Sequence, residues 1–336
     1  MSWYNTEGND PHVLYSKTCY IRNIALSPFQ KKLGDKNREA IFKKIDSILQ
    51  KNGFSCENIS AGDSLKPISL AEKGFADASF VSSDTARAVY FNEPCSLSIA
   101  LGGKDLITIS SLLSGNSLPE TRNIASGAEE LLDRSLEFAF ADGVGYLSPI
   151  PENCGSGVIF SALIYIPSLS KSEEIDSIRH QLAASGVDIF PTFTHKDTDL
   201  FTVTYSPPHA CDEGAAAESF SMILGSIIGR EKELLAIISE ENCQIIADRA
   251  WKAYGALRYA RLLSEGEMLS LSSQIRVALI ATNGEGLPPI TATALNKMLF
   301  ENLNSSLFLT RKACRSEIDL CRGRAEAVSA LLSSAG

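Results

Sequence analysis

The stretch GYLSPIPENCGSGVIFSALIYIP, residues 145–167, joins an elaborate turn to an apolar segment. Two prolines, two glycines, one asparagine and one cysteine lie between Leu147 and Val158. The residues from Val158 to Ile166 carry no charge, and the segment ends at Pro167. This pattern predicts a buried strand preceded by a loop of fixed shape, and such loops usually position functional groups.

The composition is that of an ordinary globular protein. The 336 residues are 44% hydrophobic and 21% charged, in the usual range for soluble domains. The net charge of −9 argues against nucleic acid as a partner. An anionic substrate would therefore need a local basic site.

Cysteine and histidine usage gives no sign of disulfides or a metal site. The eight cysteines are scattered without a C-x-x-C pair, as expected for reduced thiols of a cytosolic protein. The four histidines lack metal-ligand spacing; His195 with Asp197 is the nearest candidate, and a polar turn is the alternative. No signal peptide is visible, and no apolar run is long enough to cross a membrane.

The first two thirds of the chain mix strands and helices. Helical periodicity begins at Asp35 and stops before Gly53, while residues 54–84 are predicted to be loops with short strands. The segment from Leu106 to Leu113 fits both periods; we prefer a helix capped by Asp105, with a strand as the alternative. Further strands are predicted at 13–21, 87–91, 96–101, 158–166 and 200–205, and further helices at 121–140 and 175–185.

The last third is predicted to be helical. Long connections between strands, rather than β-α-β alternation, favour an α+β fold with a largely antiparallel sheet flanked by helices. We expect an α/β domain at 1–228 and a helical region at 229–336. The Rossmann G-x-G-x-x-G fingerprint and the P-loop are absent. The helices are predicted at 212–228, 230–240, 243–264, 265–280, 291–303 and 312–333.

Four stretches together resemble the phosphagen, or guanido, kinases, most closely the bacterial protein arginine kinases. The 145–167 stretch matches G-Y-L-T-x-C-P-T-N-x-G-T-G before a strand ending in H-L-P. Residues 248–280 match a helical segment, D-R-x-x-R-S-Y-G, that is found in the bacterial subgroup. VLYSKTCYIRN at 13–23 and FNEPCSLSI at 91–99 match V-L-S-S-R-x-R-L-A-R-N and x-N-E-E-D-H-L-R-I.

The resemblance implies a guanido-kinase fold, similar to the catalytic fold of glutamine synthetase. In that fold ATP and the guanidine meet over an antiparallel sheet. In the bacterial subgroup, a helical C-terminal region mediates dimer contacts and binds phosphoarginine. The resemblance therefore implies a homodimer through the C-terminal helices.

The family's phosphate-binding arginines are substituted in this chain. Family members grip the ATP phosphates with planar guanidinium forks. Lys17 and Cys19 stand in place of the first arginine pair, Ser98 replaces another arginine, and Ile159 replaces a further one. The flap expected at 187–195 contains neither arginine nor glutamate.

The groups that position the guanidine are also changed. Pro94 occupies the position of the catalytic carboxylate, and Ile150 that of the reactive cysteine. Each charge-assisted contact contributes about 1.5 to 3 kcal/mol, so losing about four forfeits several kcal/mol of phosphate binding. We therefore predict a vestigial cleft formed by Lys17, Cys19, Glu93, Ser98, Asn153 and Ile159, without confident catalytic residues.

Several residues keep two interpretations. Cys154 is either a displaced nucleophile or a small buried side chain, and Glu93 is either a guanidine partner or an exposed acid. Asn153 either holds its loop or contacts nucleotide, and Arg22 either reaches a phosphate or forms a structural ion pair.

A faint match to the R-D-x-x-R-A phosphoarginine motif makes Asp319 and Arg322 a candidate binding pair, although Ile318 replaces the leading arginine. The alternative is an exposed amphipathic helix.

The sequence thus suggests a cytoplasmic bacterial protein that resembles protein arginine kinases and has lost phosphoryl transfer. We expect no cofactor. We expect a protein partner, such as a quality-control chaperone–protease system or a kinase activator. The first alternative is an active protein arginine kinase that uses Mg-ATP and other residues. A metabolic guanido kinase of unusual design is the second. Neither nucleic acid nor membrane is expected as a partner.

Overall fold

The computed structural model describes residues 2–194, 198–208, 211–282, 284–311 and 316–334. The candidate pair His195 and Asp197 lies outside these residues. Within the described ranges, no helix is both long and apolar enough to cross a membrane.

An eight-stranded sheet forms the centre of the molecule, in the order β2-β3-β4-β5-β1-β8-β10-β9. Every paired neighbour in it is antiparallel, which confirms the predicted fold class. A small hairpin of β6 (Phe140–Ala141) and β7 (Gly145–Tyr146) stands apart from this sheet. The eight strands are β1 (Val13–Arg22), β2 (Ser55–Ile59), β3 (Arg87–Phe91), β4 (Leu97–Leu101), β5 (Ile107–Ser114), β8 (Val158–Tyr165), β9 (Val187–Pro191) and β10 (Leu200–Tyr205).

Two hydrophobic cores lie on the two faces of the sheet. The first packs α1 (Asp35–Lys51), α4 (Leu118–Asp133), α5 (Glu174–Ala183) and the first half of α6 (Glu213–Tyr259) against the strands. The second packs α2 (Leu65–Glu72), α3 (Ala78–Val81) and the C-terminal helices against the other face. Alternate strand residues enter opposite cores: on β3, Ala88 and Tyr90 belong to the first and Val89 and Phe91 to the second.

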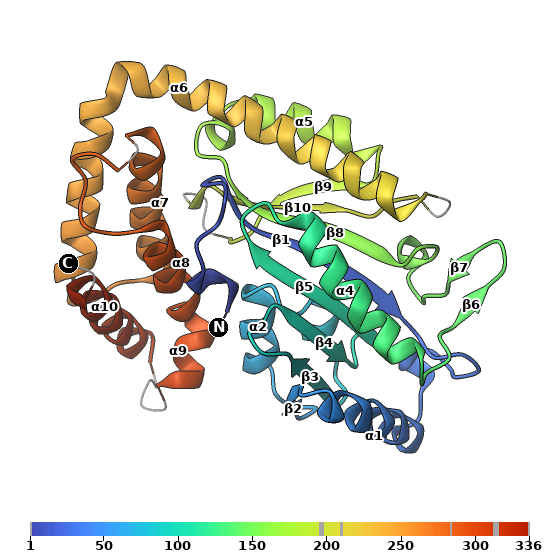
Figure 1. The fold of residues 1–336 in the computed structure, drawn as a ribbon. Helices are drawn as coiled ribbons and strands as arrows, with labels where there is room; N and C mark the ends of the chain where they lie inside the picture. The colour runs from blue at the N-terminus through green and yellow to red at the C-terminus, as the bar shows by residue number, and fades with distance from the viewer. Residues whose placement is uncertain (1, 195–197, 209–210, 283, 312–315, 335–336) are drawn as a thin grey trace.

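The C-terminal helices form a region beside one end of the sheet (Figure 1). The first half of α6 runs along the sheet and the second half turns into this region, with non-helical backbone angles at Asn242. Residue 228 therefore lies inside a continuous helix, and the division at 228/229 stays a prediction. The remaining helices are α7 (Glu265–Ala281), α8 (Ala292–Glu301), α9 (Asn304–Thr310) and α10 (Glu317–Ser334).

Several expectations about the elements were wrong, among them the helix expected at 121–140, which ends at Asp133. The segment after Asp105 is strand β5 and not a helix. The strand was missed because its apolar side chains face both cores, so the sequence shows no regular alternation of apolar and polar residues.

Residues 54–84 contain two helices, α2 and α3. Asp77 is the N-cap of α3, and its carboxylate accepts the Phe80 N–H. The break expected near residue 229 is absent, whereas the break expected between 240 and 243 coincides with the kink at Asn242 in α6, and α9 was not foreseen.

His12 is expected to make stability depend on pH. Its ring is buried, and Nδ1 lies 3.0 Å from the Tyr165 carbonyl oxygen, so Nδ1 carries a hydrogen to donate. Burial lowers the pKa of His12 below its ordinary 6.5, although Asp10 acts in the opposite direction. The unfolded chain therefore takes up a proton that the folded chain resists, and stability falls as pH drops below about 6.5.

This dependence can be measured by urea unfolding between pH 7.5 and pH 5.5. We expect the wild-type free energy of unfolding to fall more over this range than that of His12→Gln, which does not titrate. The contribution is at most about 1.4 kcal/mol per pH unit. Equal slopes for the two proteins would contradict the burial argument.

Candidate functional site

A cavity of about 570 Å³ lies on the second face of the sheet, between the strands and the α2–α3 segment. Its floor consists of side chains from β1, β8 and β10, and Phe190 and Phe193 lie at the β9 side. Three residues predicted for the vestigial cleft line this cavity: Lys17, Cys19 and Ile159. The resemblance placed the ATP–guanidine cleft over the sheet, and we refer to this cavity as the cleft.

Lys17 is the one cationic residue among the described residues that line the cleft. It is only 9% exposed, and its Nζ donates a hydrogen bond of 2.8 Å to the carbonyl oxygen of Gly74. Gly74 lies two residues after the end of helix α2, with φ of +81°, and an added Cβ would meet the Leu112 side chain at 2.7 Å. The lysine thus fastens the end of α2 to the sheet.

Two carboxyl groups offset this single cation. Asp77 caps α3 by accepting the Phe80 N–H at 2.8 Å. Glu72 accepts a hydrogen bond from Ser305, and burial raises its pKa above the ordinary value. A polyphosphate entering the cleft would meet one ammonium group and at least one carboxylate, which gives no net attraction.

The floor of the cleft is neutral at the positions where the resemblance led us to expect arginines in the family. Cys19 and Ile159 face each other as register partners on β1 and β8. Ser110 Oγ donates to Cys19 Sγ at 3.5 Å, and burial raises the pKa of the Cys19 thiol. Ser161 and Thr204 add hydroxyl groups to the lining. These side chains fit small or apolar groups rather than phosphates.

The turn between β3 and β4 does not reach the cleft. Glu93 is exposed, and neither it nor Pro94 is among the described residues that line the cavity. Ser98 is fully buried, and its Oγ donates to the Phe75 carbonyl at 3.1 Å. The structure therefore places Glu93 as an exposed acid and Ser98 in the packing beneath α2.

The 147–157 loop is held by a buried carboxylate that the sequence argument did not identify as its anchor. Asp105 Oδ1 accepts from Asn23 Nδ2 and Ser148 Oγ, each at 2.7 Å, and Oδ2 accepts from Asn153 Nδ2 at 2.9 Å. Asn153 thus holds its own loop, which agrees with its interpretation as a loop anchor and not as a nucleotide contact. Ile150 lies in this loop and is not among the described cleft residues.

Arg22 anchors the same loop from the sheet. Its Nε lies 2.8 Å from Glu129 Oε1, and its guanidinium carbon lies 3.5 Å from the Tyr146 ring centroid. Nη1 donates to the carbonyls of Ile21, Ser156 and Gly157 at 2.7, 3.2 and 3.3 Å. Its Nε and Nη1 are thus committed to a structural ion pair and to backbone carbonyls.

The two remaining candidates lie away from the described cleft lining. Cys154 Sγ donates to the Ser148 carbonyl at 3.5 Å, within the anchored loop. Asp319 and Arg322 form an ion pair of 3.4 Å one turn apart on α10, and both side chains are at least one third exposed. No group of three His, Cys, Asp or Glu residues in the described ranges is arranged to hold a metal ion.

Comparisons with known proteins agree with this geometry. The family model described as the ATP:guanido phosphotransferase C-terminal catalytic domain matches residues 36–205, half of the 336-residue chain. The protein-arginine kinase of Pelotomaculum thermopropionicum is 24% identical over 298 residues, which cover 85% of this chain and 83% of that protein. That of Clostridium kluyveri is 25% identical over 317 residues, which cover 90% and 89%.

Solved structures show the same fold. A lombricine kinase structure superposes with a TM-score of 0.56 at 17% identity, and the match covers 68% of each chain. The duplicated taurocyamine kinase of Schistosoma mansoni gives a TM-score of 0.54 at 17% identity. The match covers 67% of this chain and one third (33%) of the duplicated one. The catalytic-domain match takes in most of the strands that form the cleft floor, and the chain belongs to the ATP:guanido phosphotransferase family.

Proposed function

We propose that this protein is a protein-arginine-kinase-like pseudokinase that has lost phosphoryl transfer and acts by binding another protein. One observation carries the proposal: among the described residues that line the cleft, the single cation is Lys17, whose Nζ is engaged with the Gly74 carbonyl. Phosphoryl transfer depends on positioning and on neutralising charge, and Mg-ATP brings several negative charges into one cleft. The described lining offers two carboxyl groups and no guanidinium to meet them.

The proposed role is regulatory, in bacterial cytoplasmic protein quality control. The partner would be a chaperone–protease system or a kinase activator, and the C-terminal helices would form a homodimer. We expect large apolar side chains that are exposed along α6 to take part in binding proteins. They include Met222, Ile237, Trp251 and Tyr259.

Thermal unfolding with and without Mg-ATP tests the loss of nucleotide binding. A ligand at 100 times its Kd stabilises a protein by about 2.7 kcal/mol, which is readily seen as a rise in Tm. We expect no magnesium-dependent rise for the wild type at millimolar ATP, and none for Lys17→Met. A large rise that Lys17→Met abolishes would show a working nucleotide site and would favour the active kinase, with Mg-ATP as its cofactor.

The same assay examines Asp319 and Arg322 as a phosphoarginine-binding pair. Stabilisation by phosphoarginine, but not by arginine, that Arg322→Ala removes would support binding there. If phosphoarginine produces no shift, the pair is part of the exposed surface of α10.

A further inference from the structure

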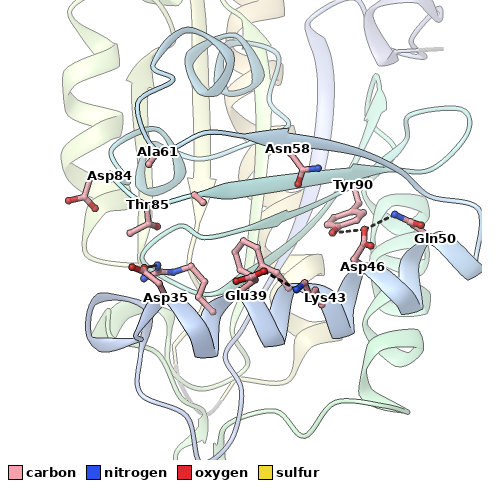
Figure 2. A pocket seen from close by; sticks show the side chains of 13 residues that line it. Asp35, Glu39, Lys43, Asp46, Gln50, Asn58, Ala61, Asp84, Thr85 and Tyr90 are labelled. Carbon is pink, nitrogen blue, oxygen red and sulfur yellow. Dashed lines mark hydrogen bonds and ion pairs between the residues drawn. The ribbon is translucent and has the colours of Figure 1, made fainter.

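A groove of about 730 Å³ lies on the other face of the sheet from the cleft, between α1 and strands β2 and β3. Figure 2 shows its lining side chains along α1, from Asp35 to Gln50, with Asn58 and Tyr90 on the strands. About 15 residues of helix correspond to about 22 Å. An extended chain of about seven residues has the same length. The groove borders β2, the edge strand of the sheet.

The groove carries excess negative charge. Both cations in its described lining are paired: Arg38 with Asp35, and Lys43 Nζ with Glu39 at 2.8 Å. Two further carboxylates line it, Asp46 and Asp84.

The donors to Asp46 are neutral. Its Oδ1 accepts from the Tyr90 hydroxyl at 3.1 Å and from Gln50 Nε2 at 2.8 Å. Asp84 is exposed at the opposite end of the groove from Gln50 (Figure 2). Two uncompensated carboxylates in a chain of net charge −9 favour a cationic occupant.

Unpaired buried polar atoms point to a ligand independently of this charge. Arg38 lines the groove, is 8% exposed, and its Nε has no partner among the described residues. Gln30 donates from Nε2 to Thr85, which also lines the groove, while its buried Oε1 has no partner in the described part of the chain. An unsatisfied buried polar atom costs about 1 to 3 kcal/mol. Gln30 itself is not among the described residues that line the groove, so the argument rests on Arg38 Nε, for which a peptide carbonyl supplies an acceptor.

The ring of Phe42 is the aromatic surface that the groove offers to the side chains of a basic segment. Phe42 is half-buried, whereas Tyr90 is only 2% exposed and takes part through its hydroxyl, which donates to Asp46. Aromatic faces bind guanidinium groups and the methylene stems of basic side chains. We propose that the groove binds an extended, arginine-bearing segment of a partner protein, with arginines at Asp46 and Asp84 and a backbone carbonyl at Arg38 Nε.

The choice of a peptide as occupant rests on the proposed protein-binding role, but the two fail separately. ATP binding reports on the cleft on one face of the sheet, and peptide binding reports on the groove on the other. If the protein proves to be an active kinase, the groove can still bind a peptide. If the protein is inactive and no peptide binds, the groove proposal alone fails.

Fluorescence anisotropy tests the proposal with the full-length chain and a fluorescein-labelled peptide of seven alternating arginines and leucines. We expect saturable binding that weakens with added salt, since the contacts are partly exposed ion pairs. The double variant Asp46→Asn/Asp84→Asn should weaken binding at least tenfold. A peptide with glutamate in place of every arginine should not bind.

Two further variants separate the groove from the general negative charge of the protein. Glu120→Gln/Glu130→Gln removes the same number of charges from exposed positions on α4 and should leave peptide affinity unchanged. Ala61→Trp fills the groove from an exposed position without changing charge and should weaken binding. Absence of binding, or equal affinity for all the variants, would overturn the proposal.

Discussion

Arg324→Met is expected to lower the free energy of unfolding by about 3 to 5 kcal/mol, the cost typical of breaking a buried charged network. Arg324 is 1% exposed in the helical region. Its Nε and Nη1 each donate at 2.9 Å, to the carbonyls of Asn302 and Leu263, and Nη2 donates to the Asn304 side chain. The guanidinium thus joins the ends of three helical segments to α10. Methionine fills similar space but leaves these buried acceptors without their donor.

Urea unfolding followed by circular dichroism measures this loss. Arg322→Met is the matched control, because it removes the same charge two residues away on the same helix, from an exposed position. Exposed substitutions usually change stability by no more than about 0.5 kcal/mol. If the two variants lose similar stability, the contacts of Arg324 do not hold the helical region together.

Arg22→Met is expected to have an effect of similar size, about 3 to 5 kcal/mol, at the other end of the molecule. The buried guanidinium pairs with Glu129 at 2.8 Å and stacks on Tyr146. Gly157 lies so close that an added Cβ would meet Arg22 Nη1 at 2.6 Å, so the loop is built around this side chain. Removing it leaves Glu129 without its cation and the loop carbonyls without a donor.

A double-mutant cycle with Glu129→Gln checks this account. Arg22→Met should cost less in the Glu129→Gln background, because the carboxylate is then no longer left unpaired. Arg134→Met, at an exposed position after α4, is the control for loss of an arginine. Additive effects of the two changes would show that Arg22 and Glu129 do not act together.

The sequence predicted best those helices and strands that bury one face and expose the other to solvent. Helix α1 follows its apolar stripe and ends before Gly53, which has φ of +80°. Strand β5 was missed because Ile107 and Ile109 face one core while Leu112 faces the other, so its apolar residues do not alternate. The length of α6 was missed because buried contacts on both sides of Gly229 keep the chain helical, Ile228 and Glu231 among them.

The family resemblance led to three of the six predicted cleft residues that do line the cavity, but not to their partners. Lys17, Cys19 and Ile159 were found because each can be aligned with a family motif. The acceptor for Lys17, Gly74, lies 57 residues away, so only the folded chain shows that this lysine has a structural role. Asp105 was assigned as a helix cap because its three partners, Asn23, Ser148 and Asn153, lie 43 to 82 residues from it.

The central claim is that the cleft no longer transfers phosphate, and a phosphotransfer assay tests it most directly. The purified full-length protein would be incubated with Mg-ATP labelled at the γ-phosphate and with a denatured, arginine-rich protein. The account predicts acid-labile arginine labelling no higher than in the absence of the protein. Labelling well above that background, and lost when the cleft cation is removed in Lys17→Met, would contradict it.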